Sequence, residues 1–200
     1  CLPTDLVART AELEVAAHHI WAQARADNNF AAFAPTLEQM LELKREAAEH
    51  MGYTDHPYDA LLNEYERGMT AKRVKELFDA HKPDLVALIA AIRAKGDVVD
   101  DSMLHQPFDV AKQRAFGEMV VKAYGYDFKR GRQDEAVHPF CTNFGQGDVR
   151  ITTRFTPDFL NPALFGTMHE AGHAMYEQNV APSLEGTPLS RGTSLGVHES

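Results

Sequence analysis

The chain has 200 residues, of which 44% are hydrophobic and 24% are charged, a balance typical of a folded globular protein. Its formal net charge of −9 argues against binding to nucleic acid, because a nucleic-acid partner calls for a basic surface. No apolar run approaches the ~18 to 20 residues that a membrane span requires, so we expect neither a membrane nor a nucleic-acid partner.

Apolar residues recur at helical spacing through most of residues 1–137, which predicts one helix after another with short connections. The expected helices cover residues 4–28, 36–51, 59–65, 71–78, 83–95 and 109–123. Their expected start signals are capping residues and prolines, namely Thr4, Pro35, Thr70, Pro83 and Asp109. In the last of these helices the side chains expected to face the core are Phe116, Met119, Val120 and Ala123.

The pattern changes at His138, where proline, glycine and aromatic residues precede a stretch of alternating β-branched and polar residues. The alternation predicts a short strand with Val149, Ile151 and Thr153 on one side. Because glycines just before this strand predict a turn, we expect a small β hairpin here.

A further helix is expected from about Pro157 or Phe159 to Gln178, directly after the hairpin. The fold class is therefore expected to be mainly α, a multi-helix architecture with a small β insert. We expect a helical region over residues 1–137 and a β insert with a metal-site region over residues 138–200, both within one domain.

Two cysteines, Cys1 and Cys141, are too few for a disulfide framework, so we expect reduced thiols and a cytoplasmic location. The chain opens at Cys1, not at a methionine, and within helical sequence. Both ends therefore look truncated, and we expect this chain to be a piece of a larger protein.

Residues 169–173 read H-E-x-x-H on the helix that follows the hairpin. His169 and His173 are separated by only ~6 Å along the helix and ~40° around it, so both imidazoles can bind one ion from the same face. Glu170 follows the first histidine, where its carboxylate can take a proton from water activated by the ion. The alternative is a pair of half-exposed histidines on an amphipathic helix, and the bare pattern leaves it open.

A catalytic zinc site has three protein ligands and keeps one position open. Glu199 lies 26 residues after His173 (199 − 173 = 26), beyond a segment whose prolines and glycines prevent one continuous helix. Thr193 or Ser194 can cap a second helix that brings Glu199 back against the first. Two histidines on one helix and a glutamate on the next form the ligand set of the glutamate-type zinc peptidases.

Four motifs occur in order along the last third of the chain. They are His-Pro-Phe at 138–140, D-x-R-x-T at 148–152, H-E-x-x-H at 169–173 and H-E-S at 198–200. With these motifs the chain resembles the Taq-type zinc carboxypeptidases, a cytosolic and mostly helical family. That family continues with Ile-Arg-x-x-Ala-Asp and Gly-x-x-Gln-Asp-x-His-Trp stretches, which these 200 residues lack, so the resemblance implies an internal fragment.

The resemblance also implies a cofactor, a substrate class and residue roles. The cofactor is Zn²⁺, with Co²⁺ as the alternative, and the substrates are peptides that lose C-terminal residues one at a time. Glu170 is implied as the general base, while His138 and Arg150 are implied near the active-site groove in structural or substrate-positioning roles. The implied metal ligands are His169, His173 and Glu199. A homodimer is compatible with the sequence.

Three alternatives stay open at this point. Arg150 either grips the free carboxylate of the substrate or forms a structural ion pair, for example with Asp148. An oligopeptidase with the same zinc apparatus would cleave internally, and a metal-binding or structural fragment would have no activity. A C-terminally amidated peptide separates the two enzymes, because a carboxypeptidase should no longer cleave it.

Overall fold

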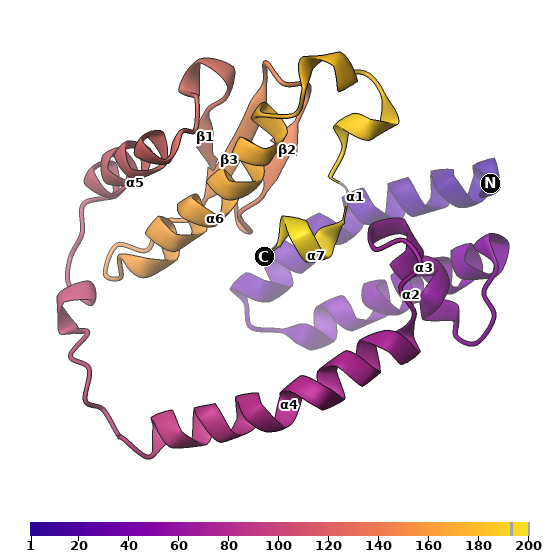
Figure 1. Cartoon of the computed structure of the whole chain (residues 1–200), viewed down its shortest axis with the longest axis horizontal. Helices are drawn as coiled ribbons and strands as arrows, with labels where there is room; N and C mark the ends of the chain where they lie inside the picture. The colour runs from indigo at the N-terminus through magenta and orange to yellow at the C-terminus, as the bar shows by residue number, and fades with distance from the viewer. Residues whose placement is uncertain (193, 200) are drawn as a thin grey trace. The chain divides into compact units, whose positions relative to one another are not determined.

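The computed structural model describes residues 1–192 and 194–199, and it is mainly helical, as the sequence predicts (Figure 1). The chain divides into two compact units, Cys1–Ile89 and Ala90–Ser200, which we call the N-terminal and C-terminal units. The helices that begin in the N-terminal unit are α1 (Thr4–Ala26), α2 (Phe30–Met51), α3 (Pro57–Tyr65) and α4 (Ala71–Arg93), which contains the division. The C-terminal unit holds α5 (Val110–Tyr124), β1 (Gln133–Glu135), β2 (Cys141–Asn143), β3 (Val149–Thr153), α6 (Asn161–Gln178) and α7 (Leu195–His198).

In the N-terminal unit, α1 and α2 pack side by side, and α3 follows against α2. The reversal between α1 and α2 uses Asn28, whose backbone adopts a left-handed φ of 50° that asparagine tolerates better than most residues. Small side chains such as Ala17 and Ala47 are buried, so the two helices can approach closely. Among the described residues, none of the helices combines the length and apolarity that crossing a membrane would take.

Three of the predicted helix starts are wrong. Thr4 is the first residue of α1 and makes no cap, because Pro3 holds the capping position. Pro35 lies inside α2, because Asn29 starts that helix earlier with a side-chain bond to a backbone N–H of its first turn. Pro83 also lies inside a helix, since α4 runs without a break although a proline removes one helical hydrogen bond.

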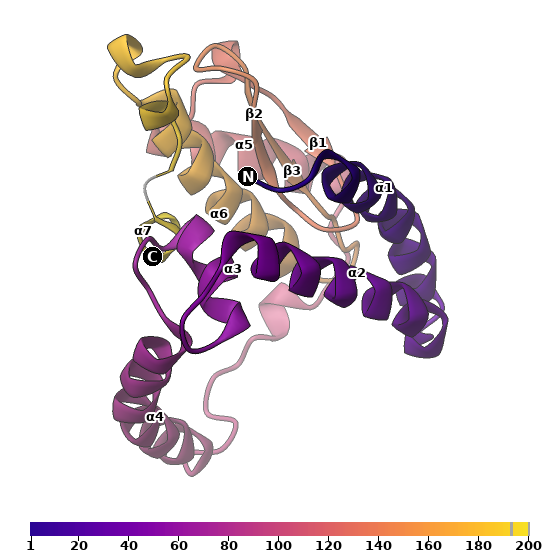
Figure 2. The ribbon, with the colours of Figure 1, turned by 90° about the vertical axis from the view of Figure 1, so that its right-hand side faces the viewer.

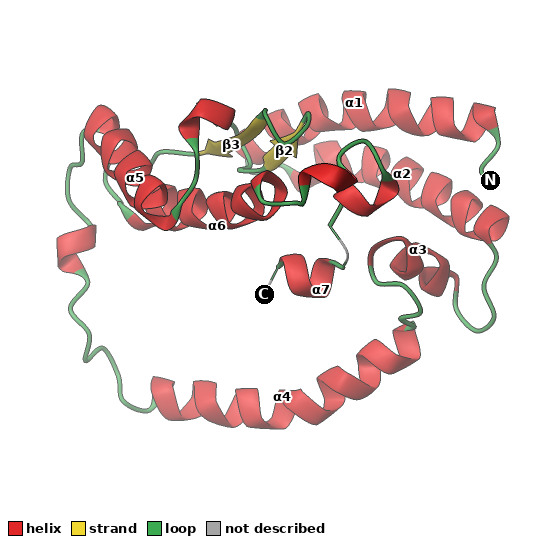
Figure 3. Ribbon diagram, turned by 45° about the horizontal axis from the view of Figure 1, so that its top comes forward, coloured by secondary structure: helices red, strands yellow, loops and turns green. Residues whose placement is uncertain are grey.

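The sheet of the C-terminal unit has three strands in the order β1-β3-β2 (Figure 1), and Figure 3 labels β3 and β2. β2 and β3 are antiparallel, which confirms the expected hairpin, and Val149, Ile151 and Thr153 are all buried. β1 pairs with β3 in parallel and was not expected, because its sequence Gln-Asp-Glu carries no strand signal. β1 also lies before residue 138, in the region that was expected to be helical. The division of the chain into two regions at 137/138 stays a prediction.

Helix α6 covers one face of this sheet, and α5 packs beside α6 (Figure 2). The shared core consists of Val121, Tyr126, Val149, Ile151, Ala171 and Ala174. The inward face predicted for α5 is wrong, since Phe116 and Met119 are exposed. The buried face instead carries Gln113, Gly117 and Val121, and Gly117 lies beside Thr167 of α6.

The turn before β1 depends on a glycine that touches the core. A Cβ added at Gly131 would lie 2.0 Å from the Val149 carbonyl oxygen and 2.2 Å from the Tyr126 hydroxyl. That hydroxyl donates a 2.7 Å hydrogen bond to the same carbonyl. We expect Gly131→Ala to lower the free energy of unfolding by about 2–4 kcal/mol, because overpacking and a broken buried hydrogen bond add together.

Urea denaturation followed by circular dichroism would measure this loss. Gly147→Ala is the matched control, since a Cβ there meets nothing within 4 Å, and it should change the free energy of unfolding by no more than about 0.5 kcal/mol. Equal stabilities of the two variants would contradict the prediction.

Candidate metal centre

The helix that carries H-E-x-x-H begins at Asn161, later than predicted, with Pro162 in its first turn, where a missing N–H costs nothing. One face of α6 is buried against the sheet and α5, and four of its six buried residues are alanine or threonine. Ala171 and Ala174 are completely buried there. This packing fixes α6 and presents both histidines of the motif to a pocket that the helix lines together with β2.

Three candidate ligand atoms converge beside α6. The Nε2 atoms of His169 and His173 are 3.1 Å apart. The Glu199 carboxylate lies 3.4 Å from the first through Oε2 and 3.7 Å from the second through Oε1. A tetrahedral ion with ligand distances of 2.0–2.2 Å sets its ligand atoms about 3.3–3.6 Å apart. The observed separations, one to each carboxylate oxygen, lie near that range, and each of the three residues offers one ligand atom within 4.8 Å of the others, so together they could hold one metal ion.

Glu199 reaches this position from the short helix α7. The Ser194 hydroxyl caps α7 by accepting a 3.1 Å bond from the Val197 N–H, while the other expected cap, Thr193, lies outside the described residues. Glu199 follows the last helical residue, and its own N–H donates to the Leu195 carbonyl at 2.9 Å. The sequence spacing and the cap together bring this carboxylate to the two histidines.

Glu170 is buried next to the candidate ligands, with 6% of its surface exposed. Burial raises the pKa of its carboxyl, an effect that the charge on Glu199 increases and that His169 opposes. Because burial destabilises the charged form of a carboxylate, a buried carboxylate accepts a proton more readily. The position therefore suits a general base.

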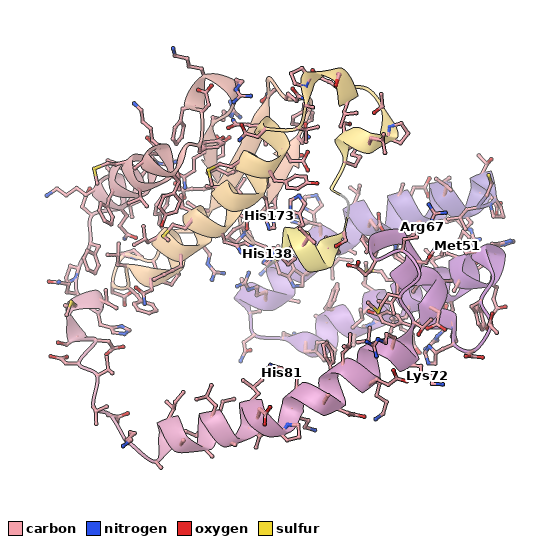
Figure 4. The ribbon with its side chains drawn as sticks, in the orientation of Figure 1. Met51, Arg67, Lys72, His81, His138 and His173 are labelled. Carbon is pink, nitrogen blue, oxygen red and sulfur yellow. The ribbon has the colours of Figure 1, made fainter. Side chains whose placement is uncertain are left out.

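These groups line a pocket of about 600 Å³, within the usual range for ligand sites. Its opposite wall comes from the segment that leads into β2 and from β2 itself, including Phe140 and Thr142. His138 lines the same pocket, and Figure 4 labels it together with His173.

The family described as Carboxypeptidase Taq (M32) metallopeptidase matches residues 1–200, the whole chain. The chain belongs to the M32 metallopeptidase family. It is 43% identical over 180 residues to Carboxypeptidase 1 of Bacillus subtilis, covering 90% of this chain and 36% of that protein. It is 41% identical over 208 residues to Thermostable carboxypeptidase 1 of Thermus thermophilus, covering 100% of this chain and 41% of that protein.

A solved structure of an M32 carboxypeptidase from Deinococcus radiodurans R1 superposes with a TM-score of 0.83 at 42% identity, covering 98% of this chain and 39% of that one. The chain thus spans about two fifths of the length of the relatives it matches. M32 proteins are metallopeptidases, so the family implies a metal ion, and His169, His173 and Glu199 are a group able to hold one.

Arg150, a predicted substrate-binding residue of this M32 chain, is engaged elsewhere. Its guanidinium binds both carboxylate oxygens of Asp148 at 2.7 Å and lies 5.1 Å from the ring centre of Phe144. The pair lowers the pKa of Asp148 and raises that of Arg150. Because side chains alternate along a strand, Arg150 points away from the core face that Val149 and Ile151 occupy. The geometry favours the ion-pair interpretation, and a role in substrate binding stays a prediction.

Sequence reasoning missed two residues that lie beside the candidate ligands, Glu177 and His198. The His173 Nδ1 atom lies 2.6 Å from the His198 Nδ1 atom, and the His198 Nε2 atom lies 3.4 Å from Glu177 Oε1. Glu177 follows His173 by four residues, just as His173 follows His169, so the same helical spacing could have identified it. His198 gave a weaker signal, as the neighbour of a ligand.

Cys141 also lines the pocket, which raises the question of thiol chemistry. Burial raises the pKa of its thiol to about 12, and the charges of Glu170 and Glu177 add to the shift. The thiol therefore stays protonated near neutral pH, whereas nucleophilic cysteines need a lowered pKa. The pocket is not arranged for cysteine-based hydrolysis, which agrees with the M32 assignment.

Proposed function

We propose that the intact protein, meaning the natural polypeptide that contains residues 1–200, is a zinc carboxypeptidase that releases C-terminal amino acids from peptides. The observation that carries the proposal is the convergence of His169, His173 and Glu199 beside the buried Glu170. Membership of the M32 family and the names of the relatives support it.

The donor set supports zinc as the cofactor. Two imidazoles, one carboxylate and an open fourth position are typical of catalytic zinc, and cobalt accepts the same ligands. Once bound, a divalent ion supplies Lewis-acid polarisation of the scissile carbonyl and makes water more acidic. The two cysteines are both free, which supports a reducing compartment such as the cytoplasm.

Glu170 would move the proton in this reaction. Its carboxylate would accept a proton from the attacking water and later deliver it to the leaving amine nitrogen. Its low exposure keeps bulk water from competing for that proton. The raised pKa of the carboxyl strengthens its action as a base.

The pocket suits an extended peptide with a free C-terminus. β2 is an edge strand of the sheet and lines the pocket, so its backbone can pair with a peptide strand. Arg191 also lines the pocket, and its guanidinium can bind a terminal carboxylate. These features favour removal of terminal residues over internal cleavage.

One pair of substrates tests the proposal. The intact protein, loaded with zinc, should release the last residue of a free-acid peptide, detected by mass spectrometry. The same peptide amidated at its C-terminus should react at least about 10-fold more slowly, because the carboxylate that Arg191 would bind is lost. Cleavage of both peptides at internal bonds would instead identify an oligopeptidase, and no cleavage of either would refute the proposal.

A further inference from the structure

We propose that His198 and Glu177 are positioning residues, which hold the ring of His173 with its Nε2 lone pair directed at the metal. This inference rests on the proposed function, and neither residue belongs to the ligand set. His198 contacts His173 through one ring nitrogen and Glu177 through the other. The three side chains therefore form one connected row.

The direction of every hydrogen bond in this row follows from metal binding. To bind an ion through Nε2, His173 must carry its ring proton on Nδ1. Its Nδ1 atom is 2.6 Å from the His198 Nδ1 atom, so His173 donates and His198 accepts. The proton of His198 then resides on Nε2, which faces the Glu177 carboxylate at 3.4 Å. This arrangement gives the Nδ1–H of His173 and the Nε2–H of His198 one acceptor each, and the His198 backbone forms a further hydrogen bond with the His173 ring.

Burial separates this row from the open side of the site. The side chains of His173, His198 and Glu177 are 13%, 14% and 13% exposed, whereas those of His169 and Glu199 are 53% and 54% exposed. Water therefore competes weakly for the hydrogen bonds of the row. A charge-assisted bond is stronger in such surroundings than at the surface.

Packing fixes the two positioning side chains. The His198 ring centre lies 4.7 Å from that of His173 and 4.6 Å from that of Tyr176. The backbone at Gly192 approaches the ring so closely that an added Cβ would lie 2.6 Å from its Cδ2 atom. The second carboxylate oxygen of Glu177 accepts a bond from the Asn143 amide of β2. The row is thus anchored to the sheet at one end and to the ligand at the other.

The test is zinc affinity of the intact protein, measured by competition with a chromogenic chelator. His198→Leu removes the acceptor for His173 and should weaken zinc binding about 10–100-fold. His198→Asn keeps an acceptor oxygen near the Nδ1 position but no donor that reaches Glu177, so it should weaken zinc binding about as much as Glu177→Gln and less than His198→Leu. Glu177→Gln keeps the shape but removes the charge and should cost about 10-fold, the lower end of the range for such outer partners.

Matched substitutions outside the site serve as controls. His81→Leu on α4 and Glu64→Gln on α3 make the same two kinds of substitution at exposed residues, and they should leave zinc affinity unchanged. If His198→Leu lost its native circular dichroism, the comparison of Glu177→Gln with the wild type would decide.

The inference is overturned if Glu177→Gln and His198→Leu both bind zinc within about 3-fold of the wild type, or if His198→Asn is as weak as His198→Leu. In either case a wild type that binds zinc and releases C-terminal residues leaves the proposed function standing. A wild type that takes up no zinc refutes the proposed function, and this inference falls with it.

Discussion

Glu170→Gln should lower kcat by about 10²–10⁴-fold while zinc stays bound, because general acid–base groups contribute rate factors of this size. The substitution preserves the shape of the side chain but removes its charge and its ability to accept a proton. With 6% of Glu170 exposed, an amide in the same space should not admit water or disturb the packing of α6. Steady-state release of a C-terminal residue and zinc content by mass spectrometry, on the same preparation, measure both halves of the expectation.

Stability provides an internal control for this variant. Burial disfavours the charged form of Glu170, as its raised pKa indicates, so a neutral glutamine should not lower the melting temperature. Glu64→Gln on the surface of α3 should change neither rate nor stability. A Glu170→Gln enzyme that retained more than a tenth of wild-type kcat would exclude Glu170 as the base.

Glu199→Ala should weaken zinc affinity on the order of 10²–10³-fold. The binding free energy of a four-coordinate structural zinc is about 10–16 kcal/mol, so each ligand contributes roughly 2.5–4 kcal/mol. Glu199 is half exposed and close to both histidines. Alanine offers no ligand atom in its place, so only the two histidines remain to bind the ion. Zinc content after dialysis and the dissociation constant from chelator competition would measure the effect.

His138→Ala is the matched control for this second prediction. His138 lines the same pocket and has the same metal-binding chemistry, but it is not in the group of converging ligand atoms. It should keep zinc at the wild-type level. Near-stoichiometric zinc in dialysed Glu199→Ala would show that a different residue completes the site.

Local signals in the sequence predicted several element boundaries, although three of the five expected helix starts are wrong. Asp109 caps α5 through a 2.9 Å bond to the Lys112 N–H, and Gly52 and Gly125 end α2 and α5 with positive φ angles. Two other failures depend on distant contacts. β1 exists because β3 offers it a partner, and the buried face of α5 is the one that packs against α6.

The candidate site likewise has some features that local spacing predicts and others that depend on distant contacts. The four-residue spacing fixes the relation of His169 to His173, because a helix has only one geometry. The position of Glu199 could be predicted only as far as a capped helix after a loop. The contact between His173 and His198 depends on the course of the intervening chain, which no spacing rule describes, and the ion pair of Arg150 with Asp148 was one of two open interpretations.

The central place of β3 has a consequence for how the C-terminal unit folds. β2 and β3 are joined by residues 144–148 alone and can form early as a local hairpin, whereas β1 can pair only with a β3 that is already in place. The folding nucleus should therefore contain the β2–β3 hairpin and the part of α6 that packs on it. Destabilising changes in β3 should slow folding, while those in β1 should mainly accelerate unfolding.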